Sequence, residues 1–248
     1  MSKLYNYAQL HCIKSVGKIM HQTSMISDGA RIGIAMSGGV DSYVLAKVLS
    51  IRKSILPFNI ELLAIHLNPG FDVNNHLSLY EWLTSNGFAS HIEVTDYGLK
   101  GHSADNFSNS PCFFCARLRR KRLFELCDKY KLTHLALGHN AEDLVETFFL
   151  NLCRNGQVHG LSIIENMFKN KLSLIRPLLL IEKKYIIKAA KSWNLPVFAN
   201  PCPSSGNSAR SDMSKSLEHL YNISSNAKRC ITNGLLRWEM SKYFKNTG

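Results

Sequence analysis

The sequence predicts an α/β protein in which a parallel five-stranded sheet is sandwiched between helices. Short apolar runs rich in β-branched residues alternate with segments of helical periodicity, as expected when a crossover helix follows each strand. A glycine-rich turn joins the first of these runs to a helix. Of the 248 residues, 45% are hydrophobic and 19% are charged, which is enough for a large buried core.

The five expected strands are short runs of the apolar, β-branched character that is typical of strands covered on both faces of a sheet. They span residues 31–37, 61–67, 90–96, 133–139 and 171–179. Because ligands of open parallel sheets bind at the carboxyl ends of the strands, polar motifs at those ends carry the most weight.

Helices are also expected outside the sheet, at both ends of the chain. Residues 1–28 are expected to form an N-terminal helical extension, 29–205 the main domain, and 206–248 a C-terminal helical segment. No run approaches the roughly 20 apolar residues of a membrane span, and the first 20 residues lack the apolar core of a signal peptide. We therefore expect a cytoplasmic protein without membrane attachment, whose paired cysteines are metal ligands or catalytic thiols rather than disulfides.

The chain is strongly basic, with 30 Lys and Arg against 18 Asp and Glu, a net charge of +12. A surplus of this size attracts polyanions at long range, which favours nucleic acid as the partner and an anionic membrane surface as the second choice. Solubility through charge alone is the remaining interpretation.

Directly after the first expected strand comes SGGVDS, from Ser37 to Ser42. Gly38 and Gly39 permit a tight turn and a close approach of the backbone. Asp41 or Ser42 is expected to cap the following helix, whose free amide groups suit a phosphate. No Gly-Lys-Ser/Thr follows, so this is not a Walker-type loop. An ordinary strand-to-helix turn is the alternative.

A second polar motif, GHNAED, follows the fourth expected strand and contains Gly138, His139 and Asp143. Asn140 and Asp143 are expected to form a capping pair at the start of the next helix. From the spacing alone, capping and catalysis are equally good interpretations of Asp143. His139 is either a hydrogen-bonded wall residue or part of a site.

The stretch PCFFCARLRRKR joins two cysteines to a basic strip. Cys112 and Cys115 are expected just before a helix, where both sulfurs can face one ion, although this spacing also suits a redox dithiol. Cys202, in a proline-flanked loop, is the third candidate ligand. Three thiolates leave one coordination position open, which a four-iron cluster tolerates better than structural zinc does. The basic strip favours binding of a nucleic-acid backbone over a merely solvated helical face.

In their order along the chain, these motifs resemble the tRNA 2-thiocytidine synthetase family of PP-loop ATP pyrophosphatases, within the adenine nucleotide alpha hydrolase group. The resemblance covers roughly residues 30–210 and includes RPL at 176–178. It implies a Rossmann-like PP-loop fold. It also implies ATP-dependent tRNA thiolation, in which the C2 oxygen of an anticodon-loop cytidine is adenylated and replaced by sulfur, with release of AMP and pyrophosphate.

The resemblance further implies residue roles. The residues implied to bind ATP and Mg²⁺ are Ser37, Gly38, Gly39, Asp41, Ser42, Gly138 and His139. Those implied to act in catalysis are Asp41, Asp143, Cys112 and Cys115. The implied ligands of a four-iron four-sulfur cluster, with zinc as the alternative, are Cys112, Cys115 and Cys202. The implied contacts with tRNA are Arg117, Arg119, Arg120 and Arg122. A sulfur donor, such as a cysteine desulfurase or free sulfide, is the second implied partner, and a homodimer is left open.

The chain departs from the family pattern at Val40, where many members have Lys, so that lysine's role in holding phosphate is absent or supplied from elsewhere. Several other functions therefore stay open. They are thiolation of a uridine or of a small molecule by a related PP-loop enzyme, tRNA-isoleucine lysidine synthesis, an iron-free persulfide enzyme using Cys112 or Cys115, and a non-catalytic module that binds zinc and nucleic acid.

Overall fold

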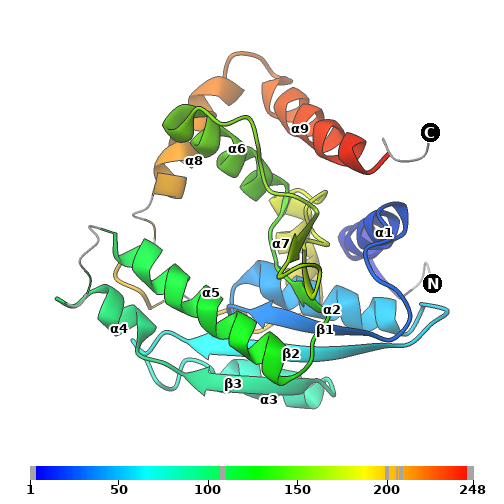
Figure 1. Cartoon of the computed structure of the whole chain (residues 1–248). Helices are drawn as coiled ribbons and strands as arrows, with labels where there is room; N and C mark the ends of the chain where they lie inside the picture. The colour runs from blue at the N-terminus through cyan, green and yellow to red at the C-terminus, as the bar shows by residue number, and fades with distance from the viewer. Residues whose placement is uncertain are drawn as a thin grey trace.

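The computed structural model describes residues 4–104, 106, 110–198, 201–204, 206 and 209–244. Its centre is a six-stranded sheet with the order β3-β2-β1-β4-β6-β5 (Figure 1). The strands are β1 (Ala30–Met36), β2 (Ile60–Asn68), β3 (Ala89–Val94), β4 (His134–Ala136), β5 (Ile164–Met167) and β6 (Leu172–Ile175). All neighbouring strands run parallel except β5, which is antiparallel to β6.

The predicted α/β class is confirmed, but the predicted count of five strands is wrong. All five expected strands are present, and β5 is the additional one. It occupies the edge of the sheet, and its two central residues, Glu165 and Asn166, are exposed. Because β5 lacks the continuous apolar run of a strand buried on both faces, its sequence does not read as a strand.

Helices cover both faces of the sheet. On one face α1 (Tyr7–Gln22), α2 (Val40–Lys53) and α7 (Lys183–Ser192) contact one another and, with α3 (Leu77–Ser85), enclose the larger apolar core. On the other face lies α5 (Pro111–Lys129), which is preceded by the short α4 (Tyr97–Gly101). Leu126 and Cys127 of α5 pack in a second apolar core on residues of β2, β4 and β6.

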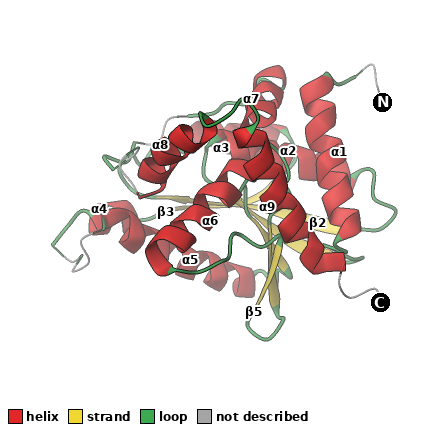
Figure 2. Cartoon of the chain, turned by 90° about the horizontal axis from the view of Figure 1, so that it is seen from above, coloured by secondary structure: helices red, strands yellow, loops and turns green. Residues whose placement is uncertain are grey.

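The remaining helices form a group that α6 holds together. α8 (Ala209–Tyr221) and α9 (Ala227–Phe244) both contact α6 (Ala141–Asn155), as Figure 2 shows from above. The buried Glu239 of α9 accepts a hydrogen bond of 3.1 Å from the backbone N–H of Ile163, which fastens α9 next to the edge strand. The expected domain boundaries stay a prediction, and residue 205 lies outside the described part of the chain.

In the ranges that the structure describes, no helix has the length and the apolar character needed to cross a bilayer.

Candidate active site

The glycine loop lies at the carboxyl end of β1. Gly39 is the N-cap of α2, and among the described residues no side chain caps this helix, so the prediction that Asp41 or Ser42 does so is wrong. The serines brace the loop instead. Ser37 Oγ accepts a hydrogen bond of 3.2 Å from Gly39 N, and Ser42 Oγ donates one of 2.8 Å to Gly39 O. The first amide groups of α2 are thus left without a side-chain acceptor, which is the arrangement that binds phosphate at helix starts.

Gly38 is required at its position for two reasons. Its φ is +80°, in the left-handed region, and a Cβ there would lie 1.9 Å from the ring of Phe198. On the other side of the loop, a Cβ on Gly138 would approach the backbones of Asp41 and Ser42 to 3.3 Å. Both glycines therefore allow neighbouring segments to close tightly around the start of α2.

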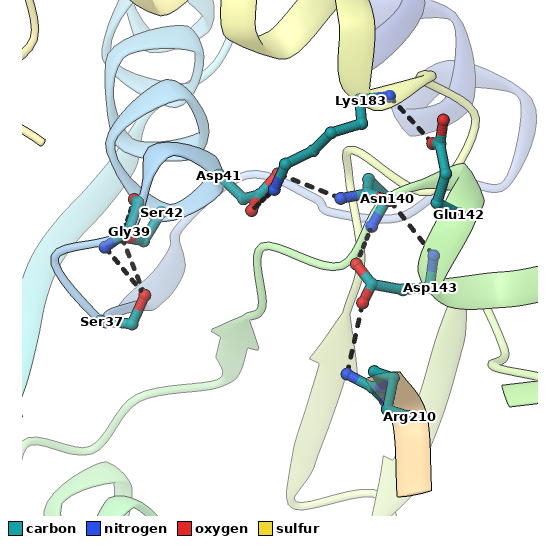
Figure 3. Close-up of polar contacts among 9 residues, drawn as sticks. All are labelled: Ser37, Gly39, Asp41, Ser42, Asn140, Glu142, Asp143, Lys183 and Arg210. Carbon is teal, nitrogen blue, oxygen red and sulfur yellow. Dashed lines mark hydrogen bonds and ion pairs between the residues drawn. The ribbon is translucent and has the colours of Figure 1, made fainter. Parts of the chain in front are cut away.

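The GHNAED motif meets the glycine loop because β1 and β4 are neighbouring strands. The expected capping pair is confirmed: Asn140 N donates to Asp143 Oδ2 at 2.9 Å, and Asp143 N donates to Asn140 Oδ1 at 3.2 Å. Asn140 Nδ2 also donates to Asp41 Oδ1 at 3.0 Å (Figure 3). This amide therefore joins the starts of α2 and α6, a link that the capping pattern alone does not indicate.

Asp41 has a second partner that sequence reasoning missed. The ammonium of Lys183, the first residue of α7, binds Asp41 Oδ2, and the backbone N–H of Lys183 donates to Glu142 Oε2 at 2.9 Å (Figure 3). No local signal distinguishes Lys183 from the adjacent Lys184, because both lie at the start of an amphipathic helix. Only the packing of α7 against α2 brings one of them to the loop.

His139 is held as a neutral hydrogen-bond donor. Arg176 Nε donates to His139 Nδ1 at 3.3 Å, which leaves the ring proton on Nε2. Desolvation, followed by the charges of Arg176 and Arg210, lowers the pKa of His139 to about 3. Arg176 is itself buried and donates to Ser162 O at 2.6 Å and to Glu165 Oε2 at 3.0 Å. In this structure Arg176 therefore orients His139.

Carboxylates of α6 meet a cation from α8, a contact that sequence reasoning also missed. Arg210 Nη1 lies 3.3 Å from Asp143 Oδ1, and Arg210 Nε lies 3.7 Å from Glu146 Oε2. Burial, with the adjacent charge of Asp143, raises the pKa of Glu146. Arg210 offsets part of this repulsion and so stabilises two neighbouring carboxylates beside the glycine loop.

The three candidate cysteines are brought together. Cys112, Cys115 and Cys202 line one cavity of about 170 Å³. The first two lie in the opening turns of α5 rather than before the helix, because Ser110 caps it and Pro111 fits its first position. Since residues three apart share a helix face, both thiols reach the same cavity.

The donor set, three cysteine thiols that line one cavity, suits an iron-sulfur cluster, because thiolates are the usual ligands of such clusters. Among the residues whose positions are described, no three His, Cys, Asp or Glu side chains gather closely enough to hold one metal ion. Burial raises the pKa of the Cys115 thiol, an effect that Arg119 partly opposes. The cavity wall includes Pro69 and Phe71, so the thiols lie in partly apolar surroundings.

Arg119 lies between the cysteines and the glycine loop. It lines the cysteine cavity and also two cavities, of about 310 and 240 Å³, that Ser37 lines as well. The larger of these also holds Asp41, His139 and Asp143. In the described part of the chain, the buried Nε of Arg119 has no hydrogen-bond partner. The three cavities thus adjoin, and a guanidinium is common to all of them.

The predicted basic strip falls into three environments. Arg117 and Arg120 are exposed on α5, whereas Arg119 faces the cavities. Arg122 is 2.9 Å from both Glu93 and Glu125, and these two partners raise its pKa. The tRNA contact stays a prediction for all four arginines, of which Arg117 and Arg120 are exposed on the surface.

Comparison with known proteins gives relatives along most of the chain. The family model of the PP-loop domain matches residues 9–212. A tRNA-cytidine(32) 2-sulfurtransferase of Geobacter sulfurreducens is 32% identical over 223 residues, which are 89% of this chain and 87% of the relative. One from Dichelobacter nodosus is 33% identical over 188 residues, which are 75% of this chain and 70% of the relative.

A solved structure with a similar fold is that of the U34-tRNA thiolase NcsA from Methanococcus maripaludis with its [4Fe-4S] cluster. Its TM-score is 0.74 at 25% sequence identity, and the match covers 92% of this chain and 80% of that chain. These similarities confirm the resemblance that the motifs indicated. The chain belongs to the PP-loop domain family.

Proposed function

We propose that this protein is an ATP-dependent tRNA sulfurtransferase that replaces the C2 oxygen of an anticodon-loop cytidine with sulfur. One observation carries the proposal: the glycine loop and the three thiols line adjoining cavities that share Arg119. A non-catalytic module that binds zinc and nucleic acid does not need the glycine loop, and a tRNA-isoleucine lysidine synthetase does not need the three thiols. The relatives named for sulfur transfer to cytidine 32 support the same activity.

The loop and the GHNAED motif serve the activation of the base. The C2 oxygen attacks the α-phosphorus of ATP, the bond to the bridging oxygen breaks, and pyrophosphate leaves. Amide groups at the start of α2 stabilise the leaving pyrophosphate, and Asp41 would help to hold a Mg²⁺ ion that offsets the phosphate charge. His139, kept neutral by its surroundings, donates from Nε2 toward the α-phosphate.

The cysteine cavity serves the delivery of sulfur. Cys112, Cys115 and Cys202 would hold a four-iron cluster, which would supply an iron without a protein ligand to bind sulfide. Sulfide then attacks C2, the C2–O bond breaks, and AMP leaves. We propose that Arg119 stabilises the negative charge of the departing AMP and that Asp143 assists in proton transfer or metal binding; both residues line the same cavity as Ser37.

The RNA substrate is proposed to lie across α5. The exposed Arg117 and Arg120 would hold its backbone, while a base from a single-stranded loop enters the cavities. A sulfur donor, a cysteine desulfurase or free sulfide, completes the reaction. A cytoplasmic location and a homodimer stay predictions.

Thiolation of a uridine is the second candidate function, because the NcsA structure with TM-score 0.74 is that of a U34-tRNA thiolase. The test is anaerobic incubation of the cluster-loaded protein with tRNA, Mg²⁺, ATP and sulfide, followed by digestion and mass analysis of the nucleosides. We expect 2-thiocytidine with an equal amount of AMP, and neither product with Asp41→Ala. Thiouridine would establish the second candidate, and AMP without any thiolated nucleoside would refute both.

A further inference from the structure

A histidine shares the cavity of the three thiols. His102 lines this cavity, and its Nε2 lies 3.8 Å from Cys202 Sγ, within hydrogen-bonding distance for a sulfur atom. The same nitrogen lies 3.3 Å from Ser204 Oγ. Both partners come from a loop about 100 residues further along the chain. Only the fold brings them to His102, so the spacing of the cysteines does not indicate this contact.

Close packing sets the position of the histidine ring. His102 is the C-cap of α4, and its ring meets the Phe71 ring edge-on, with the ring centroids 5.5 Å apart. Phe71 is itself confined, because a Cβ on Gly98 would lie 2.4 Å from its ring. On the side of α5, a Cβ on Gly101 would lie 2.9 Å from the carbonyl oxygen of Pro111. The two glycines let α4 approach Phe71 and α5 closely enough to hold His102 at the cavity.

We propose that His102 is a positioning residue, which donates a hydrogen bond from Nε2 to the sulfur of Cys202 when this thiolate binds the cluster. The inference rests on the proposed function, because it requires a cluster on the three thiols. A thiolate can only accept a hydrogen bond, so the contact places the ring proton on Nε2. Reduction of a cluster increases the negative charge on its cysteine sulfurs, and a donor at one of them stabilises the reduced form more than the oxidised form. His102 therefore raises the reduction potential of the cluster.

The test is an anaerobic redox titration of the cluster-loaded protein with dithionite, followed by absorption and electron paramagnetic resonance spectra. His102→Phe keeps a ring against Phe71 and removes the donor. At a fixed potential, we expect this change to lower the ratio of reduced to oxidised cluster by about 2- to 10-fold, the range for loss of one hydrogen bond, with about four irons per chain retained. His102→Gln offers an amide N–H in place of the ring N–H and should restore most of the ratio.

The matched control is His219→Phe, at an exposed histidine of α8 outside the cavity, and it should leave the ratio unchanged. An unchanged ratio in His102→Phe would overturn the inference. An equal fall in His102→Gln would also overturn it, since a purely structural role of the ring predicts that result. Loss of iron from both variants would overturn it as well, because His102 would then be a ligand of the cluster. A wild-type protein that binds no cluster would instead refute the proposed function itself.

Discussion

Gly38→Ala should destabilise the protein in two ways, through a strained backbone conformation and through a clash with the Phe198 ring. At φ +80° any residue other than glycine is strained, and the new Cβ would also lie 1.9 Å from the Phe198 ring. Gly29 offers a matched control, because its φ is +74° and no atom of the described residues lies within 4 Å of a Cβ built there. Gly29→Ala thus measures the cost of the backbone conformation without the clash.

The expected magnitudes follow from these two terms. A left-handed conformation costs a residue with a Cβ about 1–2 kcal/mol relative to glycine. Overpacking against a ring adds about 1–3 kcal/mol. We therefore expect Gly29→Ala to lower the free energy of unfolding by about 1–2 kcal/mol and Gly38→Ala by about 2–5 kcal/mol.

Urea unfolding of the two variants, and of each glycine change combined with Phe198→Ala, measures these terms. Removal of the ring should recover the clash term at Gly38 and leave the cost at Gly29 unchanged. Gly38→Ala should also weaken binding of a non-hydrolysable ATP analogue, because the loop must shift to relieve the contact. Equal costs at the two glycines, or no relief by Phe198→Ala, would refute the argument that the ring sets the shape of the loop.

Two further predictions concern pH and RNA. Burial lowers the pKa of His139 to about 3 and that of His66 to about 4, from an ordinary value of 6.5. As pH falls below 6.5, both histidines bind protons in the unfolded chain but stay neutral in the folded chain. The free energy of unfolding should therefore fall by up to about 1.4 kcal/mol per pH unit for each histidine. His66→Gln should make this fall less steep between pH 6 and 4, and an unchanged slope would contradict the assignment. For RNA, the double variant Arg117→Ala, Arg120→Ala should weaken tRNA binding and lower the slope of log K against log salt by about 2. The control is Lys131→Ala, at an exposed residue just after the end of α5, which should leave the slope unchanged. Equal slopes for the wild type and both variants would contradict a role of α5 in RNA binding.

The parts of the fold that could be predicted are those with local signals. Short runs of apolar, β-branched character identify the strands of the parallel sheet, and two glycines after the first run identify the turn into α2. The edge strand β5 gives no such signal, because Glu165 and Asn166 face solvent and its pairing with β6 is set by tertiary contacts.

In the candidate site, too, the residues of local motifs could be predicted, whereas the contacts made by helix packing could not. Motif order indicated the loop, the GHNAED element and the cysteines, and these residues do lie around adjoining cavities. The ion pair of Lys183 with Asp41 and the inward orientation of Arg119 depend on how α7 and α5 pack on the sheet. Neither residue differs from its charged sequence neighbours, so no pattern in the sequence separates them.

The central claim is that the three thiols hold one cluster beside the ATP site, and its most direct test is anaerobic iron, sulfide and zinc analysis with absorption spectra. The variants are Cys202→Ser and, as a control, Cys153→Ser, since Cys153 is an exposed cysteine of α6 outside the cavity. We predict about four irons and four sulfides per chain in the wild type and in Cys153→Ser, and loss of the cluster in Cys202→Ser. Zinc alone, or an iron content indifferent to Cys202, would contradict the account.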